Sequence, residues 1–484
     1  MATALKFGLL GNNTKAVSLR RNCFFRGVIL LRAIFERINE FLWGIPTLIG
    51  IITAGLYITF QNGCVQLRLF PRALRCFIRS FCGDSDKNKE SSFQALCTAL
   101  AATVGTGNIA GVAGAIAIGG PGSIFWMWVF AFLGMGVKFA EATLSVQYRK
   151  LDSNGNILGG PMYMIELGMG RRWRWLAGSY CFFGTVAAFG VGNATQINAV
   201  IDAGKQIMNC FEANDDLAVC ISIGILFSVL ITVSLLGGMK RVGKIASLLV
   251  PVASCAYILL GIGALIAHRQ QILPAFQKII LGAFSPGAIT GGTIGSIFTA
   301  LRVGASRGTF TNEAGMGTAA IAHGTSSVSH PVEQGLMGII EVFLDTIVIC
   351  TITGLVILTS GISIPYGIDE GAVLTTRAFA CTYGQWVSVP MAVFLSCFAF
   401  ATMIGWGFYG LRCVQYLLGE GAWKPFVFLQ AVICTGSVLL ETGTVWLLAE
   451  MMNGLMVIPN LVCLGALTPE LLKLVKTYKK EERL

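Results

Sequence analysis

The sequence is poor in charged residues and in histidine, and both shortages argue against a soluble enzyme. Only 12% of its residues are charged, whereas a soluble domain carries about 25%. It has no HExxH motif, no CxxC pair and no GxSxG motif in a strand-to-helix setting. The three histidines, His268, His323 and His330, are expected in loops. An enzyme is therefore not expected.

The 15 cysteines and the net charge of +11 do not indicate a metal site or a nucleic-acid partner. The cysteines lie mostly in apolar stretches, where cysteine acts as a small hydrophobic residue. The basic residues are spread over short loops rather than gathered on one polar face, so they report on membrane topology. We expect no cofactor, no nucleic acid, and the lipid bilayer as the surroundings.

Long apolar segments predict an all-α polytopic membrane protein, because about 20 apolar residues span a bilayer. A basic, amphipathic segment, 1–40, precedes the spans, and a basic tail, 467–484, follows them. Eleven spans are expected, two of them broken by glycine, serine or proline. They are 41–60, 93–118 (broken), 122–147, 176–205, 218–237, 243–267, 285–303 (broken), 336–360, 387–412, 424–442 and 445–466.

The glycine-rich stretch 104–122 is the strongest local feature, with seven glycines in an apolar segment. Unwound backbone is tolerated in hydrocarbon only where protein or a water-filled cavity receives its polar groups. Glycines also let a small ligand approach the peptide groups. Close helix packing is the alternative, and the spacing of Gly107 and Gly111 fits it. The density of glycines beside Thr106 and Asn108 favours a break.

The two broken spans begin two blocks of five spans, 93–267 and 285–466. Because five is odd, the blocks enter the membrane from opposite sides. Glycine-interrupted helices at matching places in inverted halves indicate the binding site of a secondary transporter. A channel would instead need a continuous polar lining or filter loops.

The positive-inside rule orients the chain. Loops on one side hold 23 Lys and Arg residues, against 4 on the other. The C-terminus should therefore be cytoplasmic and the N-terminus outside, in the cell (plasma) membrane, although seven basic residues in the N-terminal segment oppose that placement.

Several motifs resemble the alanine or glycine:cation symporter family, also called sodium:alanine symporters. The resemblance covers roughly residues 30–475. It implies a leucine-transporter type of five-helix inverted repeat with one extra N-terminal span. It also implies import of alanine or glycine by alternating access, with sodium as the usual coupling ion. The motifs are FQALCTALAATVGTGNIAGVAGAIAIGGPG at 93–122, GGPMYMIELGMG at 159–170, TNEAGMGTAAIAH at 311–323, EVFLDTIVICTITGLVIL at 341–358 and FAFATMIGWGFYG at 398–410.

A zwitterionic substrate needs a partner for each charged end and a wall sized to its side chain. Asn108 and the amides beside it suit the carboxylate, and Gln196 is a buried amide that binds either ligand or a neighbouring helix. Trp406 could close a small pocket, or be an interfacial anchor. The substrate candidates are Gly105, Thr106, Gly107, Asn108, Gln196, Gly291, Gly292, Ile294, Thr402 and Trp406.

The resemblance places a sodium site between the first break and the span that carries Thr402. Its ligands would be the carbonyls of Thr103 and Val104 with a hydroxyl from Thr402 or Ser396. Ala401 stands where family members often have Ser or Thr. A proton-coupled small amino acid transporter of the same fold is therefore the alternative.

Charged residues inside spans are functional by default, because a charge at mid-bilayer costs several kcal/mol. Glu341 and Asp345 lie one turn apart, as do Lys138 and Glu141. Lys138 and Glu141 are expected to pair either with each other or with the span that carries Glu341 and Asp345. A structural or gating ion network is favoured over a role in ion coupling. Glu313 is expected to order an inner loop near the cytoplasmic gate.

Overall fold

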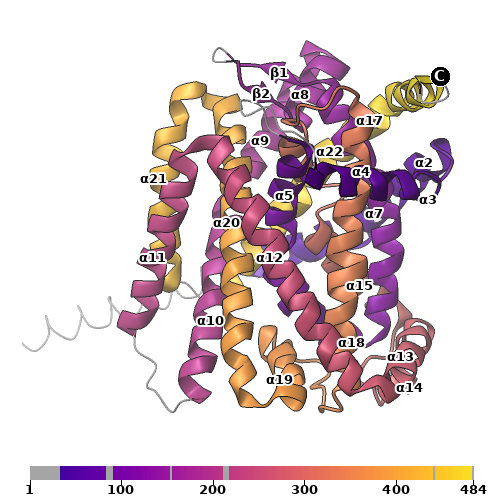
Figure 1. Ribbon diagram of the computed structural model, residues 1–484, viewed down its shortest axis with the longest axis vertical. Coiled ribbons are helices and arrows are strands. Elements are labelled where there is room, and N and C mark those ends of the chain that lie inside the picture. Colours follow the sequence, from indigo (N-terminus) through magenta and orange to yellow (C-terminus); the bar gives the residue numbers. More distant parts are fainter. Residues whose placement is uncertain (1–32, 83–90, 153–154, 211–216, 440–441, 482–484) are drawn as a thin grey trace, which may run out of the picture.

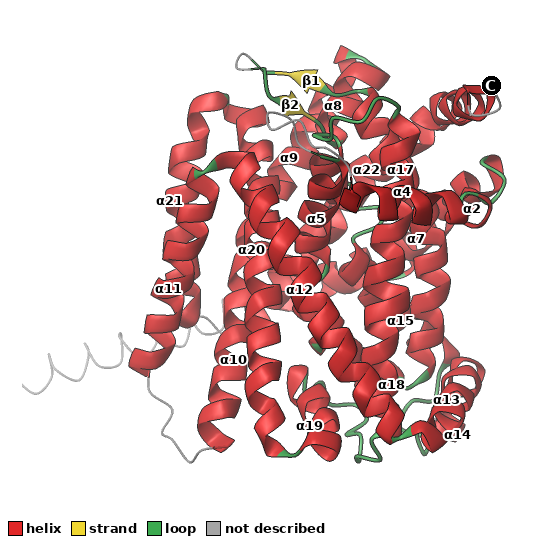
Figure 2. Cartoon of the chain, viewed as in Figure 1, coloured by secondary structure: helices red, strands yellow, loops and turns green. Residues whose placement is uncertain are grey.

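A computed structural model describes residues 33–82, 91–152, 155–210, 217–439 and 442–481, which are almost entirely helical (Figures 1 and 2). One short hairpin pairs β1 (Lys150–Leu151) with β2 (Ile157–Leu158) in antiparallel register. Most of the long helices run nearly upright in Figure 1. The hairpin and the C-terminus lie at one end of the molecule, and α13, α14 and α19 at the other.

Nine helices of the described residues are long and apolar enough to cross a membrane, which confirms the polytopic, all-α class. They comprise α2 (Ile45–Gln61), α7 (Gly122–Gln147), α9 (Arg174–Phe189) with η4 (Gly190–Ala194) and α10 (Thr195–Cys210), α11 (Leu217–Leu236), α12 (Gly238–Ala267), α17 (Pro331–Val342) with η6 (Phe343–Cys350) and α18 (Thr351–Thr359), α20 (Ser388–Leu418), α21 (Trp423–Gly436) and α22 (Thr442–Glu481).

The other elements are short and connect or flank these helices. They are α3 (Val65–Arg68), α4 (Phe70–Cys82), α8 (Pro161–Tyr163), η2 (Met164–Met169), η3 (Arg171–Trp173), η5 (Arg269–Gln271), α13 (Ile272–Phe284), α14 (Pro286–Ile289), α19 (Ala372–Tyr383), η7 (Gln385–Val387), η8 (Glu420–Ala422) and η9 (Ser437–Leu439).

The first expected break lies where the glycines predict it. Helix α5 (Ser92–Thr103) ends at Val104, a single turn η1 (Thr106–Asn108) follows, and α6 (Ala110–Gly119) resumes. The Asn108 side chain bridges the gap, because its Oδ1 accepts the Gly105 N–H at 2.9 Å. The break is therefore completed by local hydrogen bonds and is fully buried.

The second break lies after Asn312, not within 285–303 as the sequence predicts. The expected broken span 285–303 is a short α14, an irregular stretch, and the start of a regular helix α15 (Ile297–Asn312). The interruption comes after Asn312, before α16 (Thr318–His323). Glu313, Gly315 and Gly317 all have positive φ there, which ends α15. The earlier serines, proline and glycines belong to α14 and to the irregular stretches on either side of it, before α15 begins.

The two broken helices pack against each other so that the first half of each contacts the second half of the other. Helix α5 contacts α16, and α6 contacts α15. The turn η1 also contacts α15, and a Cβ atom built on Gly107 would lie 3.0 Å from Thr311 Cγ2. Gly107 therefore allows the two breaks to approach closely.

The ends of the chain also differ in part from expectation. The basic tail is not separate, because α22 is one helix of 40 residues that runs to Glu481 and contains Pro459 and Pro469. Of the N-terminal segment 1–40, only residues from 33 onward are described, and they begin a helix that leads into α2. Arg302 and Arg307, counted above for an inner loop, lie in α15.

Candidate functional site

Asn108 links the first break to η6. Its Nδ2 donates to Asp345 Oδ1 at 2.6 Å and to the Asp345 carbonyl at 3.2 Å. Because its Oδ1 accepts from Gly105, one buried amide fixes both the turn and the carboxylate beside it. Asp345 therefore lies at the first break, whereas Glu341 on the preceding turn faces other partners.

Two further predicted residues meet at the same turn. Thr106 Oγ1 donates to Gln196 Oε1 at 3.1 Å, so Gln196 from α10 contacts the first break. A Cβ atom on Gly105 would lie 2.6 Å from Thr402 Oγ1, so Thr402 from α20 faces the backbone there. Thr402 Oγ1 is buried and has no hydrogen-bond partner in the described part of the chain.

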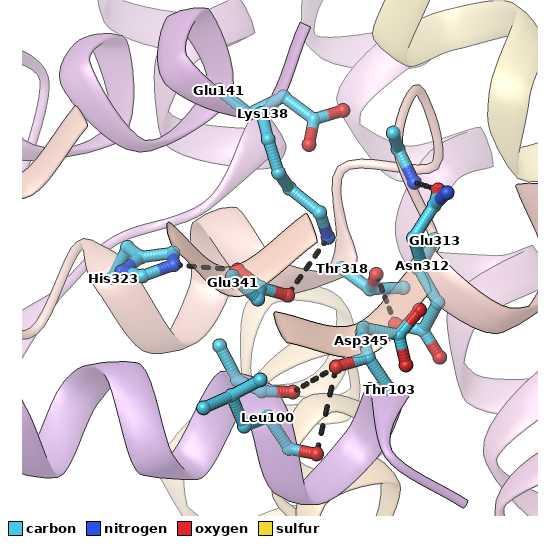
Figure 3. Close-up of polar contacts among 12 residues, drawn as sticks. Leu100, Thr103, Lys138, Glu141, Asn312, Glu313, Thr318, His323, Glu341 and Asp345 are labelled. Atoms are coloured by element: carbon cyan, nitrogen blue, oxygen red, sulfur yellow. Dashed lines mark hydrogen bonds and ion pairs between the residues drawn. The ribbon is translucent and has the colours of Figure 1, made fainter. Parts of the chain in front are cut away.

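The Thr103 hydroxyl and the Ser396 hydroxyl are placed less favourably than the Thr402 hydroxyl; the expected ligand from Thr103 was its carbonyl, not its hydroxyl. Thr103 Oγ1 donates within its own helix, to the carbonyls of Ala99 and Leu100, the second of which is labelled in Figure 3. Ser396 lies six residues before Thr402, so the two side chains leave α20 about 120° apart. Ser396 is also partly exposed. Ser396 therefore does not share the face of α20 that carries Thr402 to the first break, and Thr402 is the better placed of the two hydroxyls.

The expected wall from the second broken span is also wrong. Gly291 and Gly292 are exposed in the loop between α14 and α15. Ile294 is buried, but its side chain lies near Gly120, after the end of α6, rather than at the break. These three residues were assigned from a break that α15 does not contain.

Trp406 contacts the second break rather than a membrane interface. Its Nε1 donates to Glu313 Oε1 at 2.7 Å, and Thr318 Oγ1 donates to Glu313 Oε2 at 2.6 Å. Both Trp406 and Glu313 are buried, which excludes an interfacial anchor. A Cβ atom on Gly192 would lie 2.1 Å from Trp406 Cβ, so η4 also packs closely on this tryptophan. Glu313 is thus part of the break, and the expectation that it orders an inner loop is wrong.

Asn312 links the second break to η6, as Asn108 links the first. Its Oδ1 accepts the Ala314 N–H at 3.0 Å, and its Nδ2 donates to Thr346 Oγ1 at 3.2 Å. Thr346 in turn donates to Asp345 Oδ2 at 2.8 Å. Both breaks therefore connect to η6 at Asp345 and Thr346.

Glu141 holds the second break from α7. Its Oε1 accepts the N–H groups of Gly315 and Gly317 at 3.0 and 3.1 Å and the amide of Asn460 at 2.6 Å. Lys138 does not form an ion pair with it. Glu141 therefore connects α7 and α22 to unwound backbone, a role that its spacing from Lys138 did not predict.

Lys138 instead pairs with Glu341, as one expected arrangement had it, at 3.2 Å and with both side chains fully buried (Figure 3). Glu341 Oε2 lies 2.8 Å from His323 Nε2, and Gln334 Nε2 lies 2.7 Å from His323 Nδ1. Because the glutamine amide donates to Nδ1, Nε2 carries the proton and donates to Glu341. His323 is therefore the buried end of α16 and not a loop residue.

The buried charges around the breaks do not balance. One lysine faces four carboxylates, and all five side chains are at most 2% exposed: Lys138, Glu141, Glu313, Glu341 and Asp345. Burying unpaired charge is costly, so such a group favours the uptake of cations or protons. Asn312, Glu313, His323, Thr346 and Asn460 were missed as partners. The sequence feature that could have indicated this site is the motif TNEAGMG at 311–317, which combines polar residues with glycines.

A cavity of about 590 Å³ reaches the start of α6. Its lining includes Ala110, Gly111, Arg307, Asp369 and Glu450. Arg307 pairs with Asp369 and Glu450, each at 3.4 Å. The cavity therefore adjoins the first break at Ala110, two residues beyond Asn108.

Comparisons with known proteins find relatives over nearly the whole chain. The chain is 37% identical over 452 residues to the sodium/alanine symporter AgcS of Methanococcus maripaludis, which covers 93% of this chain and 97% of that one. It is 34% identical over 450 residues to the probable sodium/glutamine symporter GlnT of Bacillus subtilis, covering 92% and 90%.

The fold is also found among solved structures. The crystal structure of MhsT in complex with L-phenylalanine matches with a TM-score of 0.58 and 13% identity, over 79% of this chain and 90% of that one. This similarity confirms a transporter fold of the leucine-transporter type. Residues 28–484 match the sodium:alanine symporter family. The chain therefore belongs to the sodium:alanine symporter family, and this membership supports cation-coupled amino acid symport.

Proposed function

We propose that the chain imports small neutral amino acids, alanine and glycine, coupled to a sodium gradient. The observation that carries this proposal is the pair of helix breaks side by side, with the unpartnered hydroxyl of Thr402 facing the first. Both broken helices would cross the membrane, which would bring the number of spans to eleven. Transport would proceed by alternating access around the two breaks. The substrate would enter from the outside through the cavity that Ala110 lines.

Sodium would bind between the first break and α20. Sodium prefers hard oxygen ligands, and the carbonyls of Thr103 and Val104 with the Thr402 hydroxyl supply three. A buried hydroxyl without a partner is costly, and a bound cation would remove that cost. Asp345 would add a negative charge next to this site through Asn108.

The substrate would lie against the backbone at Gly105 and Gly107, with Gln196 and Trp406 limiting its size. The names of the relatives include alanine and glutamine as substrates. Small substrates are favoured here because Trp406 is held from two sides, by Glu313 and by η4. A rigid indole leaves less room for a long side chain.

Uptake of labelled alanine by the purified chain in proteoliposomes should follow an imposed sodium gradient and persist when the proton gradient is collapsed. Thr402→Val should raise the sodium concentration for half-maximal uptake about tenfold, because a hydrogen bond or ligand to a charge contributes roughly 1.5–3 kcal/mol. Thr98→Val is the matched control, since Thr98 is buried and donates only within α5. Uptake that follows only the proton gradient would favour the proton-coupled alternative.

We also propose that the C-terminal end of α22 is cytoplasmic, since the charge asymmetry persists when Arg302 and Arg307 are assigned to α15. A C-terminal epitope tag should be reached by antibody only after cells are permeabilised. Labelling of intact cells would reverse the proposed orientation.

A further inference from the structure

The short helix α4 has an unusual distribution of side chains. It lies across the upright helices near the end of the molecule where the C-terminus lies (Figure 1). Ala73 is buried, and Phe70 stacks edge-on against Phe343 of η6 at 5.0 Å. Its inner face is therefore anchored to the segment that contains Asp345.

The outer face of α4 has two adjoining stripes. Leu74 and Ile78, four residues apart, are 43% and 56% exposed and form an apolar stripe. Arg75 and Arg79, also four residues apart and one position further round, are exposed and form a basic stripe. Apolar and basic stripes side by side are typical of a helix that lies in a membrane interface.

We propose that α4 binds anionic phospholipid headgroups in the leaflet at this end of the molecule. Leu74 and Ile78 would insert among the acyl chains, and Arg75 and Arg79 would contact the phosphate groups. Two observations favour lipid over a water-soluble partner. The helix follows the apolar helix α2 after the single turn α3, and its Leu74 and Ile78 are exposed apolar side chains, as Phe60 of α2 is. The arginines supply the complementary charge.

A tryptophan at position 74 would report on this contact. We expect Leu74→Trp, in the whole chain reconstituted into vesicles, to gain fluorescence that brominated phosphatidylglycerol quenches more than brominated phosphatidylcholine at equal mole fraction. The parent chain gives the background of its own tryptophans. Position 74 is exposed, so the larger side chain does not disturb the core.

The charge requirement is tested in the same Leu74→Trp background. Arg75→Gln with Arg79→Gln should weaken the preference for phosphatidylglycerol at least about tenfold, because each basic residue near an anionic surface contributes appreciably. The control is Arg171→Gln with Arg172→Gln, two exposed arginines of η3. Equal quenching by the two lipids, no quenching by either, or an equal loss of preference in both double variants would each overturn the proposal.

Discussion

Replacing Lys138 by methionine should lower the free energy of unfolding by about 3–5 kcal/mol, the cost of leaving a buried ion unpaired. The lysine and Glu341 are both fully buried and 3.2 Å apart. Without Lys138, the Glu341 carboxylate would keep only His323 as a partner close by. Denaturation of the purified variant in detergent, followed by circular dichroism, measures the loss.

A second substitution distinguishes loss of charge balance from loss of packing. Lys138→Met combined with Glu341→Gln removes both charges, so most of the stability should return. Lys473→Met is the surface control, because Lys473 is 74% exposed and pairs with Glu470 on the same turn. It should change stability by no more than about 0.5 kcal/mol. A double variant as unstable as Lys138→Met would mean that packing, rather than charge, is lost.

Asn108→Ala should weaken alanine binding about tenfold or more. The substitution removes the amide that caps Gly105 and donates to Asp345. A buried hydrogen bond to a charged group contributes roughly 1.5–3 kcal/mol, and 1.4 kcal/mol is a factor of ten in affinity. Isothermal titration of the purified variant with alanine and glycine measures the effect.

Asn62→Ala provides the comparison for Asn108. Asn62 is also buried, but its amide donates to the Ile58 carbonyl in its own helix, far from the breaks in sequence. We expect alanine affinity to be unchanged in Asn62→Ala, even if stability falls. If folded Asn108→Ala bound alanine as tightly as the parent chain, Asn108 would not belong to the substrate site.

The first break was predictable because its glycines are dense and lie inside an apolar span. The second was misplaced because composition does not distinguish unwound backbone at depth from a loop at the membrane surface. The stretch 285–296 has more serine, proline and glycine than 312–317, yet it precedes a regular helix. The residue that ends α15 with a positive φ is Glu313 and not a glycine, so the glycine content of the sequence does not mark this position.

The partners of the charged residues were predictable only in part. The spacing of Lys138 and Glu141 places them on one face of α7, but α7 meets two different neighbours along that face. Lys138 reaches Glu341 in α17, whereas Glu141 reaches backbone amides at Gly315 and Gly317. Backbone groups are exposed to a side chain only where a helix is broken, so Glu141 could not be assigned before the second break was placed.

Helix α22 has a geometric consequence for how motion at the second break would be seen. A helix of 40 residues is about 60 Å long, roughly twice the thickness of the bilayer core. Asn460, next to Pro459, is bound both to Glu141 and to the Gly315 carbonyl. The last 20 residues extend for about 30 Å of helix beyond this contact and include Pro469, where a helix can bend. If they moved as one body, a rotation of 20° at Asn460 would displace the far end of α22 by about 10 Å and so amplify a change at the break.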